Sequence, residues 1–160
     1  MYLMGASRIS RRTFVMEDWQ LIRRHAPAWP ERRALICGPT RYENWDLIKA
    51  VLQVCRPTTV VHGHSAGVDH LASLYAQMFG LNEMRFPANW RLHGLDAPLV
   101  RNQQMFLHSN PDVVVSFPGG PNCNDIVRRA RIARVPVVEI EGDWMTALQA
   151  DAMQEIRARA

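Results

Sequence analysis

From residue 33 onward, short apolar runs alternate with segments in which apolar residues recur at helical spacing. The short runs predict strands at 34–37, 58–61, 113–117 and 136–140, and a further strand is expected at 82–86, after Gly80. The periodic segments predict helices over 45–55, over 68–79, from Pro98 onward, through 126–133 and over 144–159. Gly80 stands where a helix C-cap is expected, and the polar stretch 87–97 is expected to be irregular.

This alternation predicts an α/β protein with a mainly parallel sheet of about five strands, because continuous apolar strands are typical of a sheet buried on both faces. Right-handed crossovers then arrange the helices and sheet as a Rossmann-like three-layer sandwich. The 160 residues suffice for one domain, which we place at 31–160. Residues 1–30 lie outside the pattern and are predicted to be an N-terminal extension with a short helix over 17–25.

Composition narrows the class of protein. The formal net charge of +4 suits a phosphorylated ligand or nucleic acid, but no stripe interleaves basic and aromatic residues, so nucleic acid is not the expected partner. No apolar run approaches a membrane span and the first residues lack the apolar core of a signal peptide, which predicts a cytoplasmic protein without membrane contact. Cys37, Cys55 and Cys123 show no paired spacing and are expected to be reduced.

Glycine-bearing turns follow three of the predicted strands, with the sequences CGPTRY (37–42), HGHSAGVDH (62–70) and FPGGPNCND (117–125). Parallel strands end at one edge of the sheet, and ligands bind there. Glycine permits close backbone approach, and the helix start behind each turn offers unpaired N–H groups. The turns therefore predict a phosphate site, with Asn122 or Asn124 capping the last of these helices. The dinucleotide fingerprint G-x-G-x-x-G and the Walker A loop are absent, so no cofactor is predicted.

Five stretches resemble, in this order, the SLOG superfamily and in particular its YspA-like branch: ALICGPTRY, VVHGHSAGVDHLA, FPANWRLHG, APLVRNQQM and DVVVSFPGGPNCNDIVRRAR. This Rossmann-like group includes the LOG phosphoribohydrolases and the DprA proteins. The resemblance implies binding of nucleotides or their derivatives at the glycine-rich edge, and a homo-oligomer. LOG enzymes carry P-G-G-x-G-T-x-x-E, whereas here Asn122 and Cys123 replace the Gly-Thr pair and Ile126 occupies the position of the catalytic glutamate. LOG activity is therefore not carried over.

Arg101 and Asn102 match the family's Arg-Asn pair and predict a clamp for phosphate or ribose. We expect Arg101 to be an exposed edge residue that holds the same phosphate as Gly119 and Gly120, because the third and fourth strands should lie close in the sheet. Trp90, beside Asn89, is open to two interpretations, stacking on a base or covering the sheet edge. The pair Arg41-Tyr42 is equally open, to covering a base or phosphate or to packing at the helix start.

Asp69 also has two interpretations. It either serves the ligand, through ribose hydroxyls or as a general acid or base, or complements the dipole of its helix. His62, His64 and His70 lack a recognisable ligand spacing, so no metal site is predicted. The predicted ligand-site residues are Gly38, Arg41, Tyr42, Gly63, His64, Ser65, Gly67, Asp69, Asn89, Trp90, Arg101, Asn102, Pro118, Gly119, Gly120, Asn122 and Asn124.

The leading hypothesis is a binding protein: a sensor, carrier or sponge for a phosphorylated nucleotide or nucleotide derivative. A second hypothesis is a hydrolase that cleaves the N-glycosidic bond of a nucleoside phosphate or an ADP-ribose-like molecule. Its carboxylate would be Asp69 or Asp125 and its cation Arg101. A third is a single-stranded nucleic-acid binder like DprA, against which the missing basic–aromatic stripe counts.

Overall fold

The computed structural model describes residues 31–117 and 119–140. The predicted extension 1–30, Pro118 and the predicted helix over 144–159 lie outside these residues. The elements along the chain are β1 (Arg33–Cys37), α2 (Trp45–Cys55), β2 (Thr59–His62), α3 (Val68–Met78), β3 (Asn82–Arg85), α4 (Trp90–His93), the 3-10 helix η1 (Gly94–Asp96), α5 (Ala97–Ser109), β4 (Val113–Ser116), α6 (Pro121–Ile132) and β5 (Val137–Glu139).

The five strands form one parallel sheet in the order β3-β2-β1-β4-β5, which confirms the predicted α/β architecture. The chain runs outward from β1 to β3 and then crosses back through α5 to β4, on the other side of β1. The strand order therefore reverses between β1 and β4, and such a switch point opens a crevice at the carboxyl ends of the strands. The expectation that β3 and β4 lie close together is wrong, because β2 and β1 separate them.

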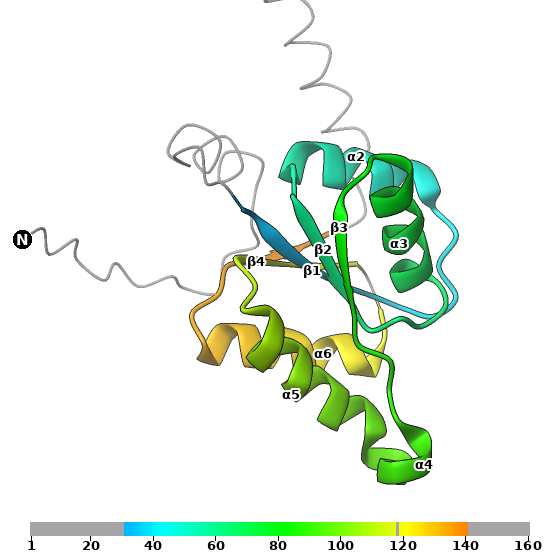
Figure 1. The fold of residues 1–160 in the computed structure, drawn as a ribbon, viewed down its shortest axis with the longest axis vertical. Coiled ribbons are helices and arrows are strands. Elements are labelled where there is room, and N and C mark those ends of the chain that lie inside the picture. The colour runs from blue at the N-terminus through cyan, green and yellow to red at the C-terminus, as the bar shows by residue number, and fades with distance from the viewer. Residues whose placement is uncertain (1–30, 118, 141–160) are drawn as a thin grey trace, which may run out of the picture.

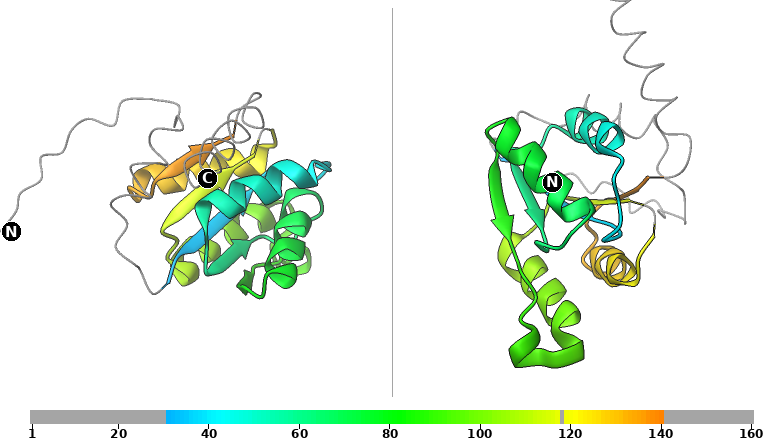
Figure 2. Two further views of the ribbon diagram at one scale, coloured as in Figure 1. Left: turned by 90° about the horizontal axis from the view of Figure 1, so that it is seen from above. Right: turned by 90° about the vertical axis from the view of Figure 1, so that its right-hand side faces the viewer.

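Helices cover both faces of the sheet, with α2 and α3 on one side and α5 and α6 on the other (Figures 1 and 2). Alternate residues of β1 serve the two layers, as the two-residue period of a strand requires. Ala34 and Ile36 pack with residues of α2 and α3, whereas Leu35 and Cys37 pack with residues of α5 and α6. The central strand β1 is thus buried on both faces, and its carboxyl end lies between the two helical layers.

The segment expected to be irregular contains a short helix and a 3-10 turn. Asn89 caps α4, and its side-chain oxygen accepts a hydrogen bond from the N–H of Leu92 at 3.1 Å. An asparagine at this position is a typical helix N-cap, and it was the local sign of α4 within the polar stretch 87–97. The end of α3 follows the prediction, since Gly80 has a φ of +65° and Leu81 donates to the carbonyl of Ala76.

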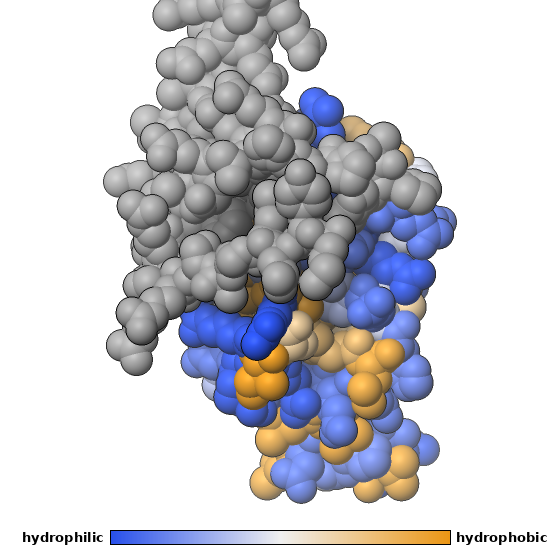
Figure 3. Space-filling model, turned by 90° about the vertical axis from the view of Figure 1, so that its left-hand side faces the viewer, coloured by the Kyte–Doolittle hydropathy of each residue, from blue (hydrophilic) through white to orange (hydrophobic). Residues whose placement is uncertain are grey.

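The surface mixes hydrophilic side chains with separate hydrophobic patches, as the face in Figure 3 shows. Leu92 and Leu95 are the most exposed large apolar residues of α4 and η1, at 71% and 93%. Within the described residues, none of the helices combines the length and the apolar character needed to cross a membrane.

Candidate functional site

Three turns meet at the carboxyl edge of the sheet around Pro39. We name them turn 1 (38–42), turn 2 (63–67) and turn 3 (119–123). The N–H of Val68 donates to the carbonyl oxygen of Pro39 at 3.2 Å, which joins turn 1 to the start of α3. A Cβ placed on Gly120 would lie 3.5 Å from the Cα of Pro39, so turn 3 borders turn 1 on the other side. The predicted meeting of the glycine turns at one edge is therefore present.

Side chains from residues just before and after turn 2 accept hydrogen bonds from its backbone N–H groups. The Asp69 carboxylate accepts a hydrogen bond from the N–H of Ser65 at 3.1 Å. The N–H of His64 donates to Nδ1 of His62 at 3.0 Å. The N–H groups of His64 and Ser65 are thus already engaged within the protein and are not offered to an anion.

Arg101 holds turn 2 from the opposite side. Its Nη1 donates to the carbonyl oxygen of Gly63 at 2.6 Å, and its Nε donates to Oδ1 of Asn102 at 3.0 Å. Burial lowers the pKa of Arg101, while the negative charge of Asp69 raises it. A Cβ on Gly63 would overlap the Arg101 guanidinium, so this glycine is required for the close approach.

The expectation that Arg101 is an exposed edge residue is wrong, because only 5% of it is accessible. It belongs to the inward stripe of α5 together with Ala97, Met105 and Ser109, which recur every four residues and are all buried. The geometric reason for a phosphate shared with Gly119 and Gly120 also fails, since it rested on adjacent third and fourth strands. A direct role of Arg101 in ligand binding stays a prediction.

Asp69 is buried, with 8% of its surface accessible. Burial raises its pKa, whereas the hydrogen bond from Ser65 and the charges of His62 and Arg101 lower it. Its position in the first turn of α3 fits the dipole interpretation, and its bonds to the loop give it a second structural task. The buried Asp69 and Arg101 charges offset one another beneath turn 2.

Sequence reasoning missed the pairing of His62 with Glu83. The Nε2 atom of the fully buried His62 lies 2.7 Å from Oε1 of Glu83. Because Nδ1 accepts from His64, the proton resides on Nε2 and is donated to the carboxylate. A hydrogen bond from Arg85, followed by those from Ser73 and His62, lowers the pKa of Glu83 to about 2, although partial burial opposes this. Histidine at the end of a buried strand was the available signal.

Turn 3 is open by contrast. Gly119 and Gly120 are exposed and have φ values of +95° and +101°. Gly120 is the N-cap of α6, so the prediction that Asn122 or Asn124 caps this helix is wrong. The helix begins at Pro121, and its first turn contains no acidic residue. Among the described residues, the N–H groups of Gly119, Gly120, Asn122 and Cys123 have no hydrogen-bond acceptor.

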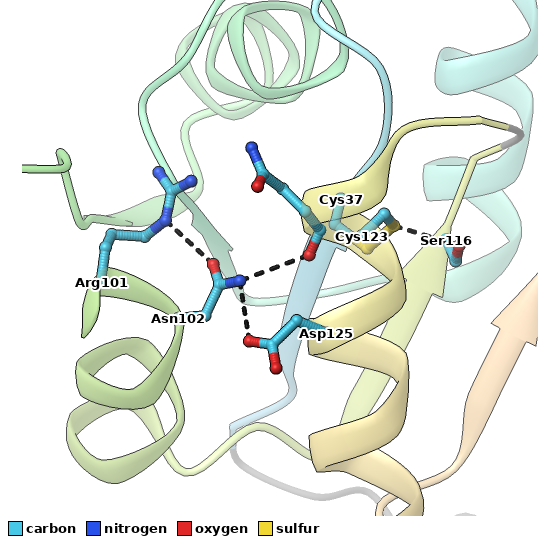
Figure 4. The surroundings of a disulfide bond; sticks show 7 residues. Cys37, Arg101, Asn102, Ser116, Cys123 and Asp125 are labelled. Carbon is cyan, nitrogen blue, oxygen red and sulfur yellow. Dashed lines mark hydrogen bonds between the residues drawn. A yellow bond between two sulfur atoms is a disulfide. The ribbon is translucent and has the colours of Figure 1, made fainter. Parts of the chain in front are cut away.

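Two anchors hold turn 3 from behind (Figure 4). Nδ2 of Asn102 donates to the carbonyl oxygen of Asn122 at 3.3 Å and to Oδ2 of Asp125 at 3.1 Å. A disulfide joins Cys37 at the end of β1 to Cys123 in the first turn of α6, with 5.5 Å between the Cα atoms. The expectation that all cysteines are reduced is wrong for this pair. The sequence separation of 86 residues gives no local sign of the contact, whereas Cys55 is free and buried.

The remaining carboxylate candidate is already engaged. Asp125 bonds to Arg128 at 2.7 Å and to Arg129 at 2.8 Å, besides Asn102. Burial raises its pKa, but the hydrogen bonds from these partners outweigh burial and lower it. Ile126, at the position of the LOG glutamate, packs in the core against the α5 layer. A carboxylate at that position would lie in an apolar environment.

The other predicted residues fall into two groups. On turn 1, Arg41 is exposed, while the ring of Tyr42 packs 5.5 Å from that of Phe117, which fits the packing interpretation for Tyr42. On α4, Trp90 is 58% exposed, so most of its surface is not used to cover the sheet. In the part of the chain that the structure describes, no group of three or more His, Cys, Asp or Glu side chains is placed to hold a metal ion.

Residues 32–93 match the family model of the YspA, cpYpsA-related SLOG family. This match spans β1 to α4, and therefore turns 1 and 2. Over these residues the chain is similar to the YspA-like branch of the SLOG superfamily. A search of curated protein sequences finds no significant match. This similarity indicates a nucleotide-related function on a Rossmann-like fold. The Arg101-Asn102 pair and turn 3 lie outside the matched residues.

Proposed function

We propose that this protein binds a phosphorylated nucleotide or nucleotide derivative, with the phosphate at turn 3. One observation carries the proposal: at the switch point of a parallel sheet, α6 begins with N–H groups that find no acceptor among residues 31–117 and 119–140, behind two exposed glycines of positive φ. Such a helix start attracts anions through its N–H groups and its dipole. The similarity of residues 32–93 to the SLOG family supports a nucleotide as the ligand class.

Turn 3 is a better phosphate site than turn 2 for two reasons. The N–H groups of His64 and Ser65 are taken by His62 and Asp69, and a carboxylate already stands at the start of α3. Turn 2 also follows β2, which lies away from the strand reversal between β1 and β4. On turn 1, the exposed Arg41 is the cation that would complement a phosphate from the other side of the crevice.

Binding without turnover is the version of this function that the side chains favour. N-glycosidic hydrolysis needs a carboxylate free to act near the anomeric carbon. Asp125 is held by Arg128, Arg129 and Asn102, and Asp69 holds turn 2. A role as sensor, carrier or sponge therefore remains the leading proposal, and the predicted homo-oligomer stays a prediction.

The test is calorimetric titration of the purified chain with AMP and with adenosine, which differ only in the phosphate. We expect AMP to bind and adenosine to bind at least about tenfold more weakly, since charge-assisted bonds to phosphate would be lost. Free base released in excess over protein would favour the hydrolase instead. Equal affinity for AMP and adenosine would contradict the proposed site. The same holds if the protein binds neither of them nor any other phosphorylated nucleotide.

A matched pair of glycine variants locates the site. Gly120→Val and Gly80→Val both place a side chain at positive φ, at +101° and +65°. Gly80 lies at the end of α3 with open space around it, whereas Gly120 begins α6. We expect only Gly120→Val to lose AMP binding. If both variants bind as the parent does, the phosphate lies elsewhere.

A further inference from the structure

Turn 3 needs support that does not use its own N–H groups. In turn 2, hydrogen bonds to those groups fix the backbone, and the same bonds remove them from any ligand. In the part of the chain that the structure describes, the corresponding groups of turn 3 have no acceptor, and the atoms nearest to a Cβ on its exposed glycines belong to Pro39 and Gly38. The conformation of turn 3 therefore depends on the two anchors behind it, Asn102 and the Cys37–Cys123 disulfide.

The disulfide lies directly behind turn 3, where it can affect the position of the proposed phosphate site. Cys37 immediately precedes Gly38 of turn 1, and Cys123 is the third residue of α6. The bond thus fixes the start of α6 to the end of the central strand across the switch point. Figure 4 shows it beside Ser116, whose Oγ lies 3.2 Å from Sγ of Cys123. The cross-link therefore restrains the start of α6, which carries the N–H groups proposed to bind phosphate.

We propose that Cys37 and Cys123 form a reversible thiol–disulfide pair that sets the ligand affinity of turn 3. This inference rests on the proposed function and adds regulation to it. The oxidised form holds the N–H groups of α6 in position and binds the phosphate tightly. The reduced form loses one of two anchors, so binding must also order the turn, and affinity falls.

The chemistry requires only a small-molecule thiol such as glutathione. Its thiolate attacks one sulfur of the disulfide, and the other sulfur leaves as a thiolate that takes up a proton. The thiolate of a second small molecule then attacks the glutathione sulfur of the mixed disulfide, and the remaining protein sulfur leaves as a thiolate. Two small thiols are thereby oxidised to one disulfide, while the protein disulfide is reduced to two thiols. Cys37 and Cys123 are 3% and 4% exposed, so attack needs local opening of turn 3.

Reciprocal linkage gives the inference a second consequence. If the oxidised form binds ligand more tightly, ligand must favour the oxidised form by the same factor. Bound nucleotide would also oppose the opening that exposes the sulfurs. The pair would then respond both to the thiol pool and to occupancy of the site.

The experiment equilibrates the full chain in buffers of reduced and oxidised glutathione, with and without AMP. Alkylation of free thiols followed by intact-mass measurement gives the fraction oxidised, and calorimetry gives the AMP affinity of each form. We expect AMP affinity to fall about tenfold on reduction, through lost preorganisation. AMP should shift the midpoint of oxidation toward the disulfide and slow its reduction. Cys37→Ala combined with Cys123→Ala should bind like the reduced parent in every buffer, while Cys55→Ala should keep the full redox response.

The outcomes separate this inference from the proposed function. If the pair oxidises but AMP binds equally well in both forms, the regulation is wrong and the nucleotide site stands. If no disulfide forms over the whole range while AMP binds, the redox pair is likewise overturned. If neither form binds AMP or any other phosphorylated nucleotide, the proposed function itself fails. If Cys55→Ala loses the redox response, the response depends on Cys55, and its assignment to the Cys37–Cys123 pair is wrong.

Discussion

Turn 2 and turn 3 flank the central strand β1 and carry similar signals, glycine after a strand and a helix start behind it, yet their backbone N–H groups have opposite fates. In turn 2 the N–H groups of His64 and Ser65 are bound by His62 and Asp69. In turn 3, no acceptor reaches those of Gly119, Gly120, Asn122 and Cys123 among the described residues. Glycine therefore makes an anion site possible, but the side chains nearby decide whether the donors are free.

The decisive difference lies in the second residue of each helix. In α3 this residue is Asp69, whose carboxylate folds back onto turn 2, whereas in α6 it is the neutral and exposed Asn122. Each turn is then stabilised in a different way. Turn 2 depends on buried polar groups, and turn 3 on the disulfide and Asn102. Four variants or conditions test this contrast, ordered by their expected effect on the free energy of unfolding.

The largest effect is expected from Gly67→Ala in turn 2. Gly67 has a φ of +70° and a ψ of −123°, and a Cβ there would overlap the carbonyl oxygen of Pro39. We expect a loss of about 4 kcal/mol or more in urea unfolding, because strain and backbone overlap act together. Gly120→Ala is the matched change in turn 3, where the nearest atom is 3.5 Å away, and should cost only about 1–2 kcal/mol. Equal losses would abolish the distinction between a packed and an open turn.

Arg101→Ala should be the next most destabilising, by about 3 kcal/mol, because it leaves the buried Asp69 without its cation and the Gly63 carbonyl without a donor. Arg101→Lys should recover part of this, since a lysine supplies the charge without the fork. The control Arg128→Ala removes an exposed ion pair and should cost less than about 0.5 kcal/mol. If Arg101→Ala keeps its stability but loses AMP, the guanidinium contacts the ligand and turn 2 belongs to the site.

Acid should loosen turn 2 before turn 3. Glu83 has its pKa lowered to about 2, so the stability it contributes is present above the ordinary glutamate value and is lost between about pH 4.5 and pH 2. Burial lowers the pKa of His62, so protonation of this residue also opposes folding as the pH falls. We expect a loss of about 1–3 kcal/mol, with Glu83→Gln flattening the profile. Hydrogen exchange at residues 63–65 should accelerate in acid more than exchange at 122–123; the reverse order would contradict the contrast.

Much of this arrangement was predictable from local pattern. The alternation of apolar runs and helical stripes predicted the parallel sheet, and parallel strands oblige their following turns to share one edge. The order of the strands was not predictable in this way, because it depends on which side of the sheet's existing strands β4 joins after the α5 crossover. The burial of Arg101 and the contact of Cys37 with Cys123 follow from that crossover and from the pairing of β1 with β4. Both are long-range consequences that single-sequence spacing does not carry.

The smallest effect on stability, and the sharpest test of the comparison, is expected from Asn122→Asp. This change places a carboxylate at the second position of α6, where Asp69 stands in α3. The new charge should complement the helix dipole and stabilise the protein by about 0.3–1 kcal/mol. The same carboxylate should occupy the free N–H groups and repel phosphate, weakening AMP binding by about tenfold or more. Asn124→Asp is the control, since it adds the same charge two residues further into α6. If the two variants weaken AMP equally, and only at low salt, the loss reflects net charge rather than closure of turn 3.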